Sequence, residues 1–273
     1  MKTYSLILTL AVAAGPLAGS SLAVPITFDP TAAGLPGAAF TFDALQGVEV
    51  SRIDNTFDMM GGLTFVENGF LQVTGATLGG VAVAPGLNAD YTLYFSFTNV
   101  TGGTAAINLP GVIDGGSLTL FGVAGASSFG FTGAGVAVVN NGGNTPVVLF
   151  SSAGAGGLIG ANVVSPNPLA LDLFATINAA VQPIVPGFIT APGGPLAFTI
   201  DAQHDSSTVQ ILDGGAVFLV RGGPDVITFA PVPEPSSLAL LGIGGATLAA
   251  CGIGRSALAT RRRRAEGRRP ASS

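Results

Sequence analysis

Short apolar runs of alternating polarity, separated by glycine, proline, asparagine and aspartate, fill the middle of this 273-residue chain. Alternation places successive side chains on opposite faces of a strand, and close spacing with turn residues favours packed antiparallel sheets. The sequence therefore predicts an all-β domain over residues 24–231, a β-sandwich or jelly roll, with a β-solenoid as the alternative. The expected strands are residues 91–97, 117–123, 135–139, 147–150, 197–200, 209–212, 216–220 and 226–229.

Two turn sequences predict hairpins between these runs. Residues 140–143 (NNGG) lie between the strands expected at 135–139 and 147–150, and residues 213–215 (DGG) precede the strand expected at 216–220. Asparagine, aspartate and glycine tolerate the positive φ that tight hairpin turns require.

Residues 168–182 fit either a helix or a strand. Asn167 and Pro168 resemble a helix start and Pro183 a helix end, since proline is favoured in the first turn and excluded from the interior. Alternating leucines at 169, 171 and 173 indicate a strand instead. We expect a strand that runs into a loop.

The N-terminus, residues 1–23, has the features of a secretory signal peptide. Lys2 is followed by an apolar run over residues 6–14, and small residues precede a cleavage site between Ala23 and Val24. The alternative is a buried N-terminal helix, which Gly15 and Pro16 disfavour. Export of the following residues is expected.

The charges divide the chain into an acidic body and a basic tail. Only 9% of the residues are charged, and residues 24–231 contain thirteen carboxylates against Arg52 and Arg221. Residues 255–273 contain seven arginines and one glutamate. The average net charge of −5 hides this division.

An uncharged segment over residues 237–254 separates the two parts. Eighteen residues give a helix of about 27 Å, just enough to span the hydrocarbon core of a membrane. The basic cluster behind it holds that end in the cytoplasm by the positive-inside rule. This cluster comprises Arg255, Arg261, Arg262, Arg263 and Arg264.

Residues 232–236 (VPEPS) precede this segment, with Val232, Pro233, Glu234 and Pro235 as the motif. A Pro-Glu-Pro motif, a single apolar helix and an arginine cluster, in this order, resemble the PEP-CTERM sorting signal of bacterial exported proteins. The nine residues after Arg264 are longer than the usual ending of that signal. The alternative is an ordinary C-terminal membrane anchor.

The resemblance implies processing by exosortase, a membrane protease, and a final place at the cell surface or in the extracellular matrix with its exopolysaccharide. It covers residues 232–264 and says nothing about the activity of residues 24–231. Flanking prolines keep the motif extended, as a protease that binds its substrate as a strand requires. No nucleic-acid partner is expected for an arginine cluster beside a membrane span.

The familiar catalytic motifs are absent. There is no His-Glu-x-x-His, no phosphate loop, no Gly-x-Ser-x-Gly and no Trp, and Cys251 is the single cysteine. With one histidine and no cysteine in the body, we exclude metal sites built on imidazole or thiolate within one chain. His204 lies near serine and aspartate, but we interpret it as a turn residue between two strands rather than as part of a triad. We predict no catalytic residue and no cofactor other than calcium.

Calcium is the metal that the aspartates suggest. Asp54 with Asp58, and Asp201 with Asp205, place oxygen ligands in or near expected loops. The alternative is an acidic, solvated surface. Tyr91 and Tyr94 suggest a sugar platform, although aromatic residues on alternating positions are more often core.

The sequence as a whole favours a non-enzymatic structural or adhesive protein of the bacterial surface. A carbohydrate-binding module is the first alternative. A secreted polysaccharide hydrolase, which would need two carboxylates facing each other across a cleft, is the second.

Overall fold

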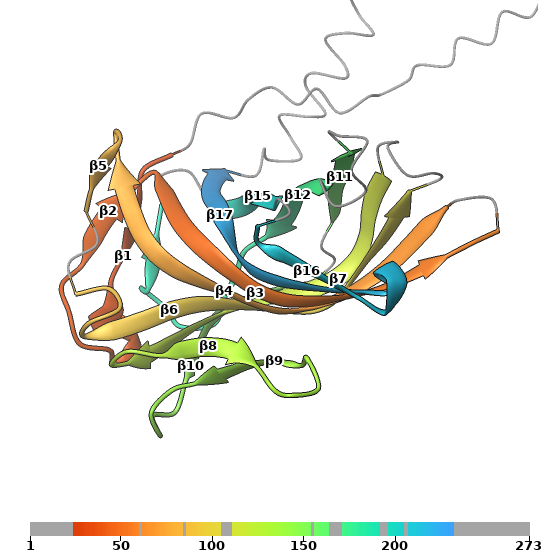
Figure 1. The fold of residues 1–273 in the computed structure, drawn as a ribbon. Coiled ribbons are helices and arrows are strands. Elements are labelled where there is room, and N and C mark those ends of the chain that lie inside the picture. Colours follow the sequence, from red (N-terminus) through yellow and green to blue (C-terminus); the bar gives the residue numbers. More distant parts are fainter. Residues whose placement is uncertain are drawn as a thin grey trace, which may run out of the picture. The chain divides into compact units, whose positions relative to one another are not determined.

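The computed structural model describes residues 24–59, 62–83, 86–104, 111–153, 156–163, 171–191, 196–204 and 207–231. These residues form an all-β domain of antiparallel strands (Figure 1), as the sequence predicts. The compact unit ends at Pro231, and residues 232–273 make up a second unit. The residues predicted to form the signal peptide and the sorting motif, the apolar segment and the arginine cluster lie outside the described residues.

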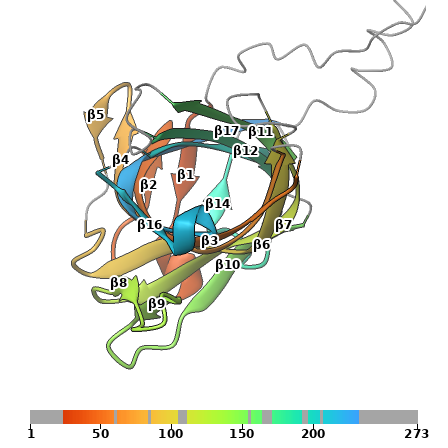
Figure 2. The same ribbon diagram turned by 45° about the vertical axis from the view of Figure 1, so that its right-hand side comes forward.

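One large sheet contains the long strands, and it closes on itself (Figure 2). The main strands are β3 (Ala44–Phe57), β4 (Leu63–Leu78), β6 (Tyr91–Thr104), β7 (Gly111–Ala124), β10 (Val147–Ala153), β11 (Gly156–Val163), β12 (Leu171–Ala180), β15 (Leu196–His204) and β17 (Val217–Pro231). The ring consists of β3, β4, β6, β7, β11, β12, β15 and β17, paired in chain order, and β17 returns to pair with β3. β10 pairs with another part of β7 and lies outside this ring.

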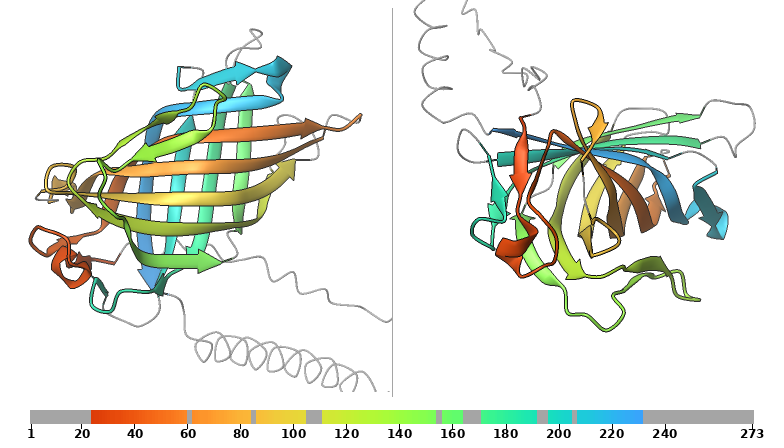
Figure 3. Two further views of the ribbon diagram at one scale, coloured as in Figure 1. Left: turned by 90° about the horizontal axis from the view of Figure 1, so that it is seen from below. Right: turned by 90° about the vertical axis from the view of Figure 1, so that its left-hand side faces the viewer.

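The closed sheet forms two layers, as expected for a sandwich. Figure 3 shows β3, β4, β6, β7 and β10, in orange to green, running across β11, β12 and β15 behind them, while β17, in blue, belongs to both layers. The core lies between the layers and is rich in phenylalanine. Phe229 of β17 has ring contacts with Phe28, Phe42, Phe150 and Phe198.

Shorter strands cover the large sheet. A three-stranded sheet of β1 (Ile26–Phe28), β2 (Phe40–Phe42) and β14 (Ile189–Thr190) contributes Phe28 and Phe42 to the core. The hairpin β8 (Ser128–Phe131) and β9 (Ala137–Asn140) packs Phe129 against Tyr94 of β6. The remaining short strands are β5 (Val81–Ala82), β13 (Gln182–Pro183) and β16 (Val209–Leu212).

The predicted hairpin at residues 213–215 is confirmed, because β16 pairs with β17 around this turn and Asp213 and Gly214 have positive φ. The hairpin predicted at residues 140–143 is wrong. β9 pairs with β8 before it, whereas β10 pairs with β7. A turn sequence allows the chain to reverse, but it does not decide which strand is the partner. The strand preferred over a helix in residues 168–182 is confirmed for β12.

Replacement of Phe229 tests the importance of this aromatic core. Phe229→Ala should lower the free energy of unfolding by about 3 to 5 kcal/mol, because it leaves a cavity among four neighbouring rings. Phe57→Ala is the matched control, since Phe57 is 45% exposed and its loss should cost less than about 1 kcal/mol. Urea unfolding measures both. Equal losses in the two variants would contradict this assignment of the core.

Candidate functional site

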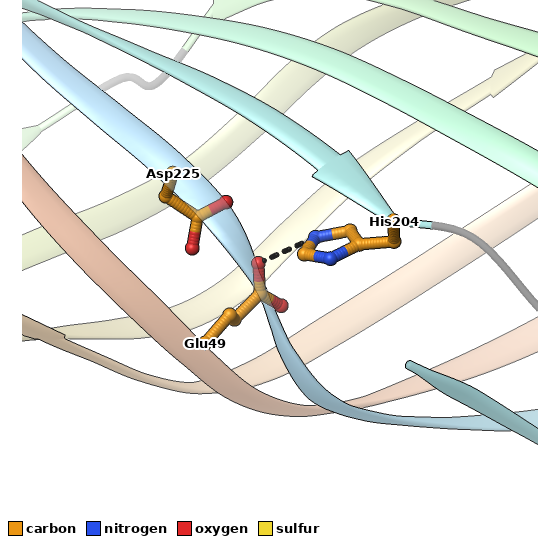
Figure 4. Close-up of side chains that lie close together, drawn as sticks. All are labelled: Glu49, His204 and Asp225. Carbon is orange, nitrogen blue, oxygen red and sulfur yellow. Dashed lines mark hydrogen bonds and ion pairs between the residues drawn. The ribbon is translucent and has the colours of Figure 1, made fainter. Parts of the chain in front are cut away.

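Three titratable side chains from three strands meet inside the closed sheet. Glu49 of β3, His204 of β15 and Asp225 of β17 point toward one another (Figure 4), and one ligand atom from each lies within 4.8 Å of the others. The Nε2 atom of His204 lies 2.9 Å from Oε2 of Glu49. The exposed fractions of Glu49, His204 and Asp225 are 5%, 5% and 1%, so water is almost excluded.

Strand alternation places His204 in the interior. In β15 the buried positions are the even ones, from Leu196 to His204, and the odd ones are less buried or exposed. His204 therefore shares the inner face with Phe198 and Ile200. It is the last residue of β15, so the interpretation of His204 as a turn residue is wrong.

A β-bulge in β17 turns Asp225 inward. Phe218 and Val220 are inner residues before the bulge, and the register with β3 shifts between Arg221 and Pro224. One extra residue in a strand changes which positions face the core. After the bulge the inner positions are therefore Asp225, Ile227 and Phe229.

Two glycines make this bulge sterically feasible. Gly222 and Gly223 have φ of 95° and 118°, which side chains with a Cβ rarely adopt. A Cβ on Gly223 would lie 2.4 Å from Nδ1 of His204 and 2.9 Å from the carbonyl oxygen of Gln203. The glycine at this position is thus a condition for the imidazole to lie where it does.

Ser51 and Glu67 extend the polar cluster. Ser51 Oγ, on the inner face of β3, is hydrogen-bonded to Oε1 of Glu49 and lies 2.7 Å from Oε1 of Glu67 on β4. One hydroxyl has a single proton, so it donates to one carboxylate and accepts from the other when that one is protonated. The serine hydroxyl is hydrogen-bonded to the two carboxyl groups and not to His204.

An apolar cavity of about 90 Å³ adjoins this cluster. Its polar walls are formed by Glu49, Glu67 and His204. The apolar lining includes Ile53, Phe65, Ile113, Ile177 and Phe218. The charged groups therefore face a low-dielectric space in which their mutual interactions are strong.

Burial and attraction compete in setting the pKa values of the ion pair. Burial alone would lower the pKa of His204, but attraction to Glu49 outweighs it and raises that pKa to about 9. Burial would raise the pKa of Glu49, but the charge and hydrogen bond of His204 lower it below its ordinary value. At neutral pH the pair is therefore an imidazolium and a carboxylate.

Burial and the charge of Glu49 favour the protonated forms of the other two carboxyl groups. Burial, followed by repulsion from Glu49, raises the pKa of Asp225 to about 8. The same two causes raise the pKa of the half-buried Glu67 well above its ordinary value. In its protonated form Glu67 would donate to Ser51, which would in turn donate to the ionised Glu49. A protonated acid carries no charge, which lowers the cost of placing these groups close together.

The calcium candidates are not part of this cluster. The Asp54 carboxylate accepts hydrogen bonds from Nε and Nη2 of Arg52, at 2.7 to 3.0 Å. Asp58 accepts from the backbone nitrogen of Gly62, and Asp201 accepts from Thr176. Asp205 lies outside the described residues. Within the described part of the chain, Glu49, His204 and Asp225 form the one group of three ligands close enough to hold an ion.

The two tyrosines considered for a sugar platform are buried. Tyr91 and Tyr94 are 0% and 2% exposed, so both belong to the interior rather than to a sugar platform.

The sequence analysis missed three residues of the polar cluster, Glu49, Glu67 and Asp225, which it counted among the solvated acidic residues. The alternation of β15 would have revealed His204, and the Gly-Gly-Pro sequence before Asp225 marks a bulge.

Comparisons with protein-family models, curated proteins and solved structures found no match to this chain. Among the residues that the structure describes, no helix is long and apolar enough to cross a membrane. The assignment of a role therefore depends on the site and on the sequence motifs.

The single histidine of the chain makes the ion pair directly measurable. In metal-free protein, the imidazole of His204 should titrate by NMR near pH 9, because Glu49 stabilises its charged form. The fold then binds this proton more tightly than the unfolded chain, whose pKa is about 6.5. The stabilisation is complete below pH 6.5, and the free energy of unfolding falls as pH rises from 6.5 to 9.

Glu49→Gln is the matched variant for this measurement. It keeps the shape of residue 49 and removes the charge that contributes most to raising the pKa of His204, so that pKa should fall well below its value in the unsubstituted protein. Asp201→Asn, at an exposed position on β15, should leave the titration unchanged. A midpoint near 6.5 in the unsubstituted protein would contradict the buried ion pair.

Gly223→Ala tests the bulge. The added methyl group collides with the imidazole and the strand backbone and occupies a strained φ, so we expect a loss of more than about 2 kcal/mol in unfolding free energy. Gly130→Ala in β8 is the control, because a Cβ there meets no atom within 4 Å. Chemical denaturation compares the two. An unaffected Gly223→Ala protein would show that the bulge adapts to a side chain.

Proposed function

We propose that this chain is an exported bacterial protein of the cell surface or extracellular matrix, sorted and trimmed by an exosortase, with a structural or adhesive role. The observation that carries the proposal is the position of the sorting motif. Strand β17 and the compact unit end at Pro231, and the motif begins at the next residue, Val232.

This position makes trimming compatible with a stable product. Leu196 of β15 pairs with Pro231, and all strand pairings of the described residues lie at or before Pro231. A cut near Pro235 would therefore remove none of the pairings or core contacts of the described residues. The product would retain the sheet and its interior, while it would lose the apolar segment and the arginines.

The geometry gives more support to a binding or structural role than to a hydrolase. The titratable cluster is buried, and its cavity of about 90 Å³ is small beside ordinary ligand pockets of roughly 300 Å³ or more. A polysaccharide chain needs an open cleft with two carboxylates facing it. Glu49 and Asp225 instead share a closed interior with His204.

Removal of the motif tests the sorting proposal. In a bacterium with an exosortase, the unsubstituted chain should be recovered at the surface or in the medium, trimmed near Pro235. A variant carrying Pro233→Ala, Glu234→Ala and Pro235→Ala should retain its arginine tail and accumulate in the membrane fraction. Intact-mass spectrometry and cell fractionation measure both outcomes.

Pro270→Ala is the control for a proline change outside the motif, and it should behave like the unsubstituted chain. Equal trimming and equal location of the two forms would refute sorting through Pro233, Glu234 and Pro235. Binding of a defined saccharide to the trimmed form on a glycan array would favour the carbohydrate-binding alternative over a purely structural role.

A further inference from the structure

The Glu49, His204 and Asp225 cluster contains buried polar atoms that have no hydrogen-bond partner. Both carboxylate oxygens of Asp225 are in this state, and they are two of the four such side-chain atoms in the described part of the chain. Buried polar groups in folded proteins are nearly always satisfied by protein, water or an ion. Asp225 is 1% exposed, and its carboxyl group points toward Glu49 and His204 without a hydrogen bond to either oxygen (Figure 4).

We propose that Glu49, His204 and Asp225 bind one divalent transition-metal ion, for which Zn²⁺ has the best-matched chemistry. The proposed ligand atoms are Nε2 of His204 and one carboxylate oxygen each from Glu49 and Asp225, all within 4.8 Å of one another. Zinc binds such atoms at about 2.0 to 2.2 Å, so two of its ligands lie about 3 to 4 Å apart. Nε2 of His204 and Oε2 of Glu49 already lie 2.9 Å apart, so binding would require the Asp225 carboxylate to approach them.

The ligand types select the class of ion. Calcium and magnesium prefer sites made of oxygen atoms, whereas imidazole nitrogen suits zinc and its neighbours in the transition series. Two carboxylates supply the charge that neutralises a divalent ion. A single histidine is sufficient for such a mixed site, so this proposal departs from the exclusion of imidazole sites that the histidine count suggested.

Neighbouring groups orient the ligands. Ser51 is hydrogen-bonded to Oε1 of Glu49, which leaves Oε2 directed at His204. The bulge holds the imidazole on its other side, where Gly223 lies against Nδ1. Partners of this kind fix ligand geometry in metal sites and affect the affinity for the ion.

The adjoining cavity leaves room for a further ligand. Glu49 and His204 line its wall, and its volume of about 90 Å³ corresponds to a few water molecules at about 30 Å³ each. Three protein ligands and one water complete the four-coordinate arrangement that zinc favours.

Direct titration tests the site in the full chain, purified in detergent without a polyhistidine tag. Cys251→Ser serves as the background, because Cys251 is the one thiol that could bind zinc elsewhere. After removal of metal by a chelator, isothermal titration with Zn²⁺ should show one ion per chain. Ca²⁺ and Mg²⁺ at the same concentrations should show no binding.

Substitution of the ligands decides whether the ion occupies this cluster. Asp225→Asn and His204→Gln should each weaken Zn²⁺ binding by at least about tenfold, whereas Asp201→Asn, on the exposed face of β15, should leave it unchanged. Absence of zinc binding, or equal affinity in Asp225→Asn and Asp201→Asn, would overturn the proposal. Circular dichroism checks that each variant is folded.

A second measurement keeps the test valid if a ligand variant fails to fold. X-ray absorption of the zinc-loaded chain should show one imidazole among nitrogen and oxygen neighbours. A zinc shell that lacks imidazole would place the ion elsewhere and would overturn the site at Glu49, His204 and Asp225.

Discussion

Closure of the large sheet is the constraint on which the rest of the structure depends. Pairing of β11 with β7 on one side and β12 on the other gives the sheet an inside that is separated from water. In this enclosed space the phenylalanine core forms, and the attraction between Glu49 and His204 outweighs the effect of burial on the pKa of each group.

The sequence predicted the strands whose inner residues are apolar, and it missed those with polar inner residues. β6, β7 and β15 alternate Phe, Leu and Ile with polar residues, and each contains a predicted strand. β3 and β4 were missed, since their inner faces include Glu49, Ser51 and Glu67, which break the apolar period.

The wrong prediction of a hairpin at residues 140–143 has another cause. Partner choice depends on contacts between segments far apart in the chain, and a turn sequence has no information about them.

The site was less predictable than the fold. His204 ends an alternating run, so its inward direction was contained in the sequence, but its partner Glu49 is 155 residues away. Asp225 faces inward only because the bulge at Gly222 and Gly223 changes the strand parity, and a simple alternation rule does not include that shift. Counting histidines and cysteines also finds only metal sites that use several ligands of one type, and it overlooks sites that combine one imidazole with carboxylates. The structure instead brings one imidazole and two carboxylates together from three strands.

The distribution of strand lengths has a consequence for how copies of this chain can associate. Most long strands are paired within the ring. Outside it, β10 has seven residues and is paired in part with β13, and the described strands β2, β5, β14 and β16 are two to four residues long. Short edges offer few free backbone groups for another chain to pair with, so stacking into fibrils through main-chain hydrogen bonds is disfavoured. Contacts between copies would then depend mainly on side chains and loops, which substitutions can change without disturbing the sheet.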